Sequence, residues 1–156
     1  MNICVLSDSH GDMRPLIGLR DKIGKVDAVF HLGDYCRDGR EAGAYLGCPV
    51  YTVRGNCDRD CPEEETERLF SLGGKRFLLL HGHTCSSLEA LFYKGKERAA
   101  DAVLFGHTHV PFCFRREGLL LLNPGSLSCP RNLSSAGCAL LTWEGEGGIT
   151  ETFLTV

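Results

Sequence analysis

The segment VLFGHTH, residues 103–109, joins an apolar run to a pair of histidines, and the fold can be worked out from it. Its β-branched, aliphatic and aromatic residues favour a strand, and Gly106 permits a sharp turn at the end. In extended backbone, residues two apart point to the same side, so we expect His107 and His109 to face one point in space. The segment therefore predicts a strand that ends in a metal site, although a histidine pair alone is more typical of a surface loop.

Four other apolar runs also end in residue types that bind metals, and this repetition argues against a chance surface loop. In sheets of parallel strands, ligands gather outside the carboxyl ends of the strands, which is where these polar clusters fall. The four clusters are Asp8-Ser9-His10, Gly33-Asp34, Gly55-Asn56-Cys57-Asp58 and His81-Gly82-His83.

The first half of the chain predicts a parallel sheet. Short continuous apolar runs are typical of strands covered on both faces, and stretches with an apolar helical stripe separate them. Asp12 is expected to cap the first helix, which stops near Gly24. Two strand–helix–strand steps favour parallel strands with right-handed crossovers. The expected strands are 3–6, 28–32 and 49–54, and the expected helices are 13–23 and 38–46.

The second half predicts antiparallel hairpins, and the two patterns together indicate a mixed α/β protein with two packed sheets. Gly73-Gly74-Lys75 separates the apolar runs 68–72 and 76–80, as a hairpin turn does. Residues 86–89 have the spacing of a helix-capping box and open a third helix. The remaining expected features are hairpin turns at 117–118 and 145–148, with a rigid loop at 123–126 between them.

Length and composition point to one domain over residues 1–156, long enough to bury about two thirds of its unfolded surface. The formal net charge of −3 argues against a general binder of nucleic acid or of anionic membranes. No apolar run approaches the roughly 20 residues that span a bilayer, and no signal peptide precedes Asp8. The nine cysteines are an odd number without a CxxC pair, which is typical of small buried hydrophobes in a reducing cytosol. We therefore expect a cytoplasmic protein.

Seven residues at the predicted strand ends form the complement of a two-metal site. Carboxylates and imidazoles without an obligatory thiolate suit Mn²⁺, Fe²⁺, Ni²⁺, Co²⁺ or Zn²⁺ rather than Ca²⁺ or a structural Zn²⁺. Two divalent ions carry four positive charges against two aspartates, so phosphate is the natural guest of the site. The candidate metal ligands are Asp8, His10, Asp34, Asn56, His81, His107 and His109.

The five motifs D-x-H, G-D, G-N-x-D, H-G-H and G-H-T-H, taken in order, resemble the calcineurin-like metallophosphoesterase superfamily and its small, single-domain YfcE-like phosphodiesterase branch. The resemblance runs from Asp8 to Ser126. It implies a four-layer α/β/β/α sandwich of two mixed β-sheets flanked by helices, with two divalent ions at the strand ends. Mn²⁺ is the expected metal, with Ni, Fe, Co and Zn as alternatives. The implied split assigns Asp8, His10, Asp34 and His109 to one ion, and Asp34, Asn56, His81 and His107 to the other, with Asp34 bridging.

The activity that this resemblance implies is hydrolysis of a phosphodiester. Two ions about 3.5 to 4 Å apart lower the pKa of a shared water and clamp a phosphoryl group for in-line attack by the bridging hydroxide, so no protein nucleophile is needed. The expected substrate is a small-molecule or nucleotide-like diester, and the loops 59–67 and 84–87 would set its choice. The candidate catalytic residues are Asn56, Cys57 and His83.

These three residues have different expected roles. Asn56 would bind a metal and donate a hydrogen bond to a phosphate oxygen. Cys57 departs from the commoner G-N-H-D/E form of the superfamily, in which the histidine is thought to protonate the leaving oxygen. A thiol would be a poor proton donor in that role. The alternative is that Cys57 only fills space. His83 would orient His81, touch substrate or serve a structural role.

Other polar residues are expected to be structural. His31 is a candidate for a satisfied core histidine, and Asp58 for a residue that holds the Asn56 loop in shape. The turn at 123–126 is expected to brace the site. The acidic stretch 61–67 lacks apolar periodicity, which indicates a solvated loop or a short helix.

Two other functions stay open at this point. The retromer subunit of the same fold looks like a phosphoesterase that has lost metal ligands, so a non-catalytic scaffold is the main alternative. All seven ligand types are retained here, which favours the enzyme. Cys57 and Cys61 are a further candidate, as a redox or metal-sensing pair. A homo-oligomer is compatible with the sequence.

Overall fold

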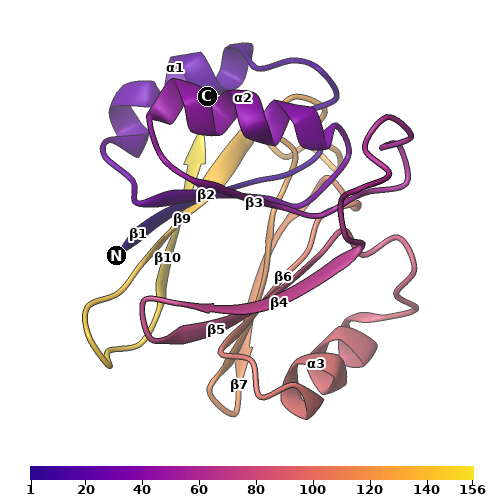
Figure 1. The fold of residues 1–156 in the computed structure, drawn as a ribbon, viewed down its shortest axis with the longest axis vertical. Helices are drawn as coiled ribbons and strands as arrows, with labels where there is room; N and C mark the ends of the chain where they lie inside the picture. Colours follow the sequence, from indigo (N-terminus) through magenta and orange to yellow (C-terminus); the bar gives the residue numbers. More distant parts are fainter.

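The computed structural model describes residues 1–156 as two five-stranded sheets packed face to face, with helices on the outer faces (Figure 1). The strand order is β10-β9-β1-β2-β3 in the first sheet and β4-β5-β6-β8-β7 in the second. The strands of the first sheet are β1 (Asn2–Leu6), β2 (Ala28–His31), β3 (Val50–Thr52), β9 (Gly137–Thr142) and β10 (Thr150–Thr155). The strands of the second sheet are β4 (Glu67–Leu72), β5 (Lys75–Leu80), β6 (Ala102–Leu104), β7 (Pro111–Arg116) and β8 (Leu119–Pro124). The helices are α1 (Arg14–Ile23), α2 (Cys36–Leu46) and α3 (Leu88–Glu97).

The inner strands β2, β6 and β8 are buried along their whole length because both faces of each sheet are covered there. Along β1, Val5 points into the core between the sheets, whereas the next residue, Leu6, packs in the cluster that includes α1. Strand β5 repeats the alternation, with Phe77 in the core between the sheets and Leu78 in the cluster beside α3. Figure 1 shows α1 and α2 over the first sheet and α3 over the second. The expected four-layer α/β/β/α sandwich is therefore confirmed.

Parallel pairing aligns the ends of the strands that carry the polar clusters. In the first sheet, β1, β2 and β3 run parallel, with Leu6 opposite His31 and His31 opposite Thr52. In the second sheet, β6 lies parallel between β5 and β8, with Leu79 opposite Leu104. The loops after β1, β2 and β3 therefore leave one edge of the first sheet together, as those after β5 and β6 do in the second.

Several local predictions are confirmed and three boundaries differ. The strand expected over 103–109 ends at Leu104. Helix α2 begins at Cys36, earlier than expected. The Asp58 carboxylate accepts the Cys36 N–H, which is one of the N–H groups that the first turn of a helix leaves without a partner. Met13, not Asp12, is the N-cap of α1; the Asp12 carboxylate instead accepts the N–H of Arg14 and pairs with its guanidinium. The confirmed features are the Ser87 cap of α3 and the turns at 73–74, 117–118 and 145–148.

The cysteines correct the sequence-based expectation in part. Cys36 and Cys61 form a disulfide, so the pair beside the site is not the anticipated Cys57 with Cys61. Seven cysteines are free, and of these only Cys4 and Cys138 are buried. The expectation of mostly buried cysteines fails because several of them lie on loops or on the edge strand β7, outside the apolar layers.

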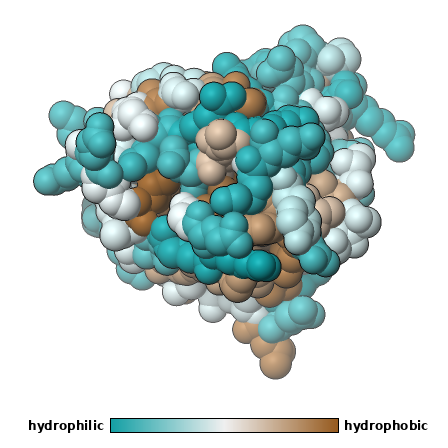
Figure 2. Space-filling model, turned by 90° about the horizontal axis from the view of Figure 1, so that it is seen from below, coloured by the Kyte–Doolittle hydropathy of each residue, from teal (hydrophilic) through white to brown (hydrophobic).

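No helix of the structure is long and apolar enough to cross a membrane. Figure 2 views the molecule from the side of α3 and shows hydrophobic residues in separate patches with polar side chains between them. A shallow apolar groove runs between α3 and strands β7 and β8, lined by Leu88, Phe92, Phe112 and Phe114 among others.

Candidate metal centre

Four of the candidate ligands meet at the edge where the strands end. The ligand atoms of Asp8, His10, Asp34 and His109 all lie within 4.8 Å of one another. His109 Nε2 is 3.1 Å from Asp8 Oδ1, and His10 Nε2 is 3.7 Å from Asp34 Oδ2. The first three residues follow strands of the first sheet and His109 follows β6, so the cluster joins the two sheets.

His81 and His107 lie on the other side of Asp34. His81 Nε2 is 3.4 Å from Asp34 Oδ1, and the centroids of the two imidazole rings are 5.3 Å apart. The two oxygens of Asp34 thus face different groups, with Oδ2 toward His10 and Oδ1 toward His81. Asn56 is exposed, and its side-chain amide nitrogen lies 3.6 Å from Cys57 Sγ.

Two buried atoms of the cluster lack a hydrogen-bond partner, namely Asp8 Oδ1 and His81 Nε2. The other oxygen of Asp8 accepts hydrogen bonds from the Ser7 hydroxyl, at 2.6 Å, and from the His107 N–H, at 3.0 Å. Buried polar atoms are normally paired, because an unpaired one costs about 1–3 kcal/mol. A carboxylate oxygen and an imidazole nitrogen left free beside each other are the donor set that a divalent cation requires, so these residues fit a metal.

Backbone carbonyls fix the orientation of two buried candidate ligands, His81 and His109. His81 Nδ1 lies 2.7 Å from the Leu32 carbonyl, and His109 Nδ1 lies 2.6 Å from the Cys129 carbonyl. A carbonyl only accepts, so each Nδ1 carries a proton and each Nε2 faces the cluster, where it would present its lone pair to a bound ion.

The backbone at the site is left-handed, not extended. Asp8, His10, Asp34, His107 and His109 all have φ between 47° and 68°. The two-residue alternation expected to align His107 with His109 is therefore wrong as a mechanism, although both side chains do reach the site. Left-handed conformations of residues other than glycine are costly and concentrate at functional sites, where the surroundings hold them.

Gly106 is required for close approach and not for a turn. Its φ is not positive, but a Cβ at this position would lie 2.0 Å from the Ser7 hydroxyl oxygen. Gly55 is similar, because a Cβ there would lie 2.2 Å from Asp34 Oδ1. The absence of a side chain at Gly106 lets its loop lie against Ser7, which supports Asp8, and the absence of one at Gly55 lets its loop lie against Asp34.

The expected structural roles of Asp58 and His31 are confirmed. The Asp58 carboxylate accepts the N–H groups of Asp34, Gly55 and Cys36 at 2.7 to 2.8 Å, which ties the loop after β3 to the loop after β2. His31 is fully buried, with its Nε2 3.0 Å from the Ser9 hydroxyl.

The turn at 123–126 braces the site as expected. The Asn123 side-chain amide donates to the Gly106 carbonyl at 2.8 Å, and the Ser126 hydroxyl donates to the Asp8 carbonyl at 2.7 Å. Three contributors to the site were not predicted from the sequence, namely the Ser7 hydroxyl and the carbonyls of Leu32 and Cys129. Only Ser7 had a signal, since it precedes an aspartate at a strand end; a carbonyl leaves no trace in the residue type.

Protonation states depend on burial and neighbouring charge. Burial opposes ionisation of Asp34, but contacts with His81 and the Cys57 N–H outweigh it and lower the pKa of this carboxyl. Partial desolvation and the nearby Asp34 raise the pKa of the Cys57 thiol. Burial, His81 and His107 lower the pKa of His83, whose ring centroid is 5.4 Å from that of His81 and whose Nδ1 is buried without a partner. Asp34 is therefore an anion, and both Cys57 and His83 are neutral near pH 7.

Comparison with known proteins agrees with this arrangement. The probable metallophosphoesterase YsnB of Bacillus subtilis is 33% identical over 151 residues, which cover 94% of this chain and 86% of that protein. Phosphodiesterase YfcE of Escherichia coli is 32% identical over 101 residues, covering 59% and 52% of the two chains. The crystal structure of Vps29 from Entamoeba histolytica complexed with Zn²⁺ superposes with a TM-score of 0.79 over 99% of both chains, at 20% identity, and so shares the fold.

Residues 1–146 match the model of the calcineurin-like phosphoesterase superfamily domain. The match spans all five polar clusters and the turn that braces them. This chain therefore belongs to the calcineurin-like phosphoesterase superfamily, a family of metal-dependent phosphoesterases.

Proposed function

We propose that the chain is a phosphodiesterase that binds two divalent ions, Mn²⁺ by preference, and hydrolyses a small-molecule or nucleotide-like diester. The observation that carries the proposal is the pair of unpartnered buried atoms, Asp8 Oδ1 and His81 Nε2, next to a four-residue cluster of ligand atoms. The proposed setting is the cytoplasm, where seven free cysteines would be usual.

The proposed ligand sets share Asp34. One ion would be held by Asp8, His10, Asp34 and His109, and the other by Asp34, Asn56, His81 and His107. The opposite orientation of the two Asp34 oxygens supports a bridging carboxylate. Asn56 would join the second set by a side-chain rotation away from Cys57, which its exposure permits.

When bound, the two ions would supply an activated water and positive charge for the phosphoryl group. The residues of the chain prepare the site for this reaction. The carbonyl-anchored histidines hold the ligand geometry without further reorganisation, which is the main source of electrostatic catalysis. The Asn56 amide would donate to a phosphate oxygen, and neutral His83 would donate a second hydrogen bond to the substrate. Cys57 stands where a leaving-group acid is expected but keeps its proton too firmly to transfer it readily.

Elemental analysis and a diester assay test the proposal together. Protein loaded with Mn²⁺ and desalted is expected to hold two ions per chain and to hydrolyse bis(4-nitrophenyl) phosphate. Asp8→Asn, which keeps the side-chain volume, should lose at least one ion and about 10²-fold or more in kcat. Asp21→Asn, on the exposed face of α1, is the matched control and should change neither. Protein that bound no metal and showed no turnover would instead favour a non-catalytic scaffold.

A further inference from the structure

A small polar cavity opens beside the metal centre. Its volume is about 90 Å³, and its lining includes Tyr35, Cys57, Asp60 and Cys61. Cys57 connects the cavity to the centre, because its N–H donates to Asp34 Oδ1 at 2.9 Å. The ring of Tyr35 lies 5.5 Å from that of His10, measured between centroids. A substrate whose phosphoryl group sat at the metals would extend part of its leaving group into this cavity.

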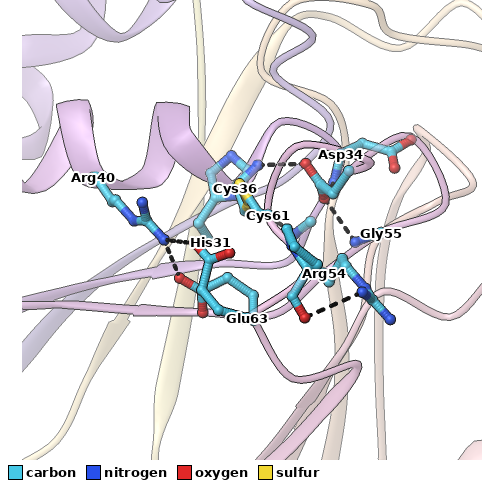
Figure 3. Close-up of a disulfide and its surroundings, with 12 residues drawn as sticks. His31, Asp34, Cys36, Arg40, Arg54, Gly55, Cys61 and Glu63 are labelled. Carbon is cyan, nitrogen blue, oxygen red and sulfur yellow. Dashed lines mark hydrogen bonds and ion pairs between the residues drawn. A yellow bond between two sulfur atoms is a disulfide. The ribbon is translucent and has the colours of Figure 1, made fainter.

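Cys61, which lines the cavity, is joined to Cys36 by a disulfide. Figure 3 shows this bond and the residues around it. Cys36 is the first residue of α2, two residues after Asp34, whereas Cys61 lies on the segment that comes after Asn56 and Asp58. The bond therefore ties the helix that starts beside Asp34 to the segment 59–66.

Little else anchors the segment 59–66. Cys61, 5% exposed, is its one buried residue. Arg40 pairs with Glu63 and Glu64 near the surface, where ion pairs contribute about 0–1 kcal/mol. Arg54 supplies the other two contacts, through its guanidinium to the Pro62 carbonyl at 3.4 Å and its N–H to the Glu65 carbonyl at 2.8 Å. The preceding loop is different, because Asp58 accepts the backbone N–H groups of Asp34, Gly55 and Cys36. These are backbone hydrogen bonds, so breaking the S–S bond does not itself remove them.

We propose that the Cys36–Cys61 disulfide is a redox-controlled clamp that sets substrate affinity by holding the segment 59–66 against the cavity. With the bond intact, Asp60 and Cys61 form the wall. With the bond reduced, the segment swings free and the leaving group loses its contacts, while the metal centre keeps its Asp58 clamp. This regulation rests on the proposed phosphodiesterase function. A disulfide among seven free thiols is itself consistent with a switch, since the disulfides of reducing compartments are usually transient or redox-sensing.

A protein or small-molecule dithiol is the co-reactant. One of its thiolates attacks Cys61 Sγ, which borders the cavity, and expels the thiolate of Cys36, which takes up a proton. The start of α2 favours this leaving group, because a helix N-terminus stabilises a thiolate. The second thiolate of the dithiol then attacks the mixed disulfide, expels Cys61 and closes a ring. Two electrons and two protons pass from the dithiol to the protein.

Thiol counting and proteolysis test the clamp without any need for activity. Protein equilibrated in an oxidising glutathione buffer and alkylated under denaturing conditions should show seven free thiols, and nine after dithiothreitol. A glutamate-specific protease should cut at Glu63–Glu65 about tenfold faster in the reduced protein, because a loosened segment opens locally. Peptide mapping that found Cys57 joined to Cys61, or equal cleavage in both states, would overturn the proposal.

Steady-state kinetics separate the clamp from the proposed function. Reduction, Cys36→Ser and Cys61→Ser should each raise KM for a nucleotide-like diester by about tenfold, with kcat and metal content unchanged, because the lost contacts bind the substrate without entering the chemistry. Cys113→Ser, on the edge strand β7, is the control and should keep its response to the dithiol. If the protein hydrolysed the diester but its KM did not change on treatment with the dithiol, the clamp would be overturned and the proposed function would stand. Absence of activity in every form would overturn the proposed function, and the thiol and protease results would still decide whether the clamp exists.

Discussion

Asp34 is the residue on which the two proposed metal positions depend. Its Oδ2 faces His10 and its Oδ1 faces His81, so removing the side chain takes a ligand from both positions. We expect Asp34→Ala to lose both ions, whereas His109→Ala should mainly weaken one, because a terminal imidazole is not shared. Metal counting after desalting decides between these outcomes. Two ions retained by Asp34→Ala would contradict the bridging role.

Cys57 is the residue that we expect to set the class of ester. Alkyl phosphomonoesters need a proton on the leaving oxygen, and the raised pKa of the thiol makes Cys57 a reluctant donor. Cys57→His should therefore raise kcat/KM for monoesters relative to diesters, since a general acid contributes about 10² to 10⁴-fold where it is needed.

The two substrate classes should be compared in both proteins at saturating Mn²⁺. Cys113→His, remote from the metal centre on β7, serves as the control for an added histidine. A ratio of monoester to diester activity that stayed constant, with metal content intact, would make Cys57 a space-filler.

At the scale of elements, α3 is tied to the second sheet by a three-residue ion cluster. Glu67, at the start of β4, pairs with Lys94 and Arg98 of the α3 region. Burial opposes ionisation of Glu67, but these two cations outweigh it and lower the pKa of the carboxyl. A carboxyl whose folded pKa is lowered stabilises the fold above its unfolded pKa, and this stabilisation disappears as pH falls through the folded pKa.

We therefore expect Glu67→Gln to lower the free energy of unfolding by roughly 0.5–1 kcal/mol at pH 7, with the difference fading below about pH 4. Urea denaturation at a series of pH values measures it. Glu97→Gln, on the exposed face of α3 with no ion pair, is the matched control. If the difference in free energy of unfolding between the two proteins stayed constant on acidification, Glu67 would act through packing and not through charge.

Sequence patterns were sufficient for the strands and insufficient for the loops at their carboxyl ends. Runs such as Ile3–Leu6 are recognisable because both of their faces are buried, so every side chain is apolar. The left-handed residues of these loops depend on close packing between one loop and the next, which no local pattern encodes. The same holds for the Leu32 and Cys129 carbonyls and for the pairing of Cys36 with Cys61, since each depends on a partner far along the chain.

At the scale of the whole molecule, the metal centre is a joint between the two sheets. Asp8, His10 and Asp34 lie after strands of the first sheet, whereas His81, His107 and His109 lie after strands of the second. Ions that bind only the folded state stabilise it by mass action, by about 2.7 kcal/mol at one hundred times the dissociation constant. Saturating Mn²⁺ should therefore raise the Tm by roughly 5–10 °C, and a chelator should reverse the shift.

Calorimetry with and without Mn²⁺ measures this shift, and Asp34→Ala should abolish it. If the ions bind ligands from both sheets, the Tm must rise when Mn²⁺ is added. Two tightly bound ions with no change in Tm would mean that the unfolded chain binds the ions as tightly as the folded protein does.

The order of strands in the first sheet has a consequence for synthesis on the ribosome. Residues 2–6 emerge well before residues 137–142, which form one of their two neighbours in the sheet. Until residues 137–142 emerge, one side of β1 is an open row of N–H and C=O groups, which is a template for pairing with another nascent chain. Ligand residues 107 and 109 also emerge well after Asp8, His10 and Asp34, so the set of metal ligands is incomplete until then. Chaperone protection of the nascent amino-terminal half should therefore matter more for yield than the stability of the finished protein.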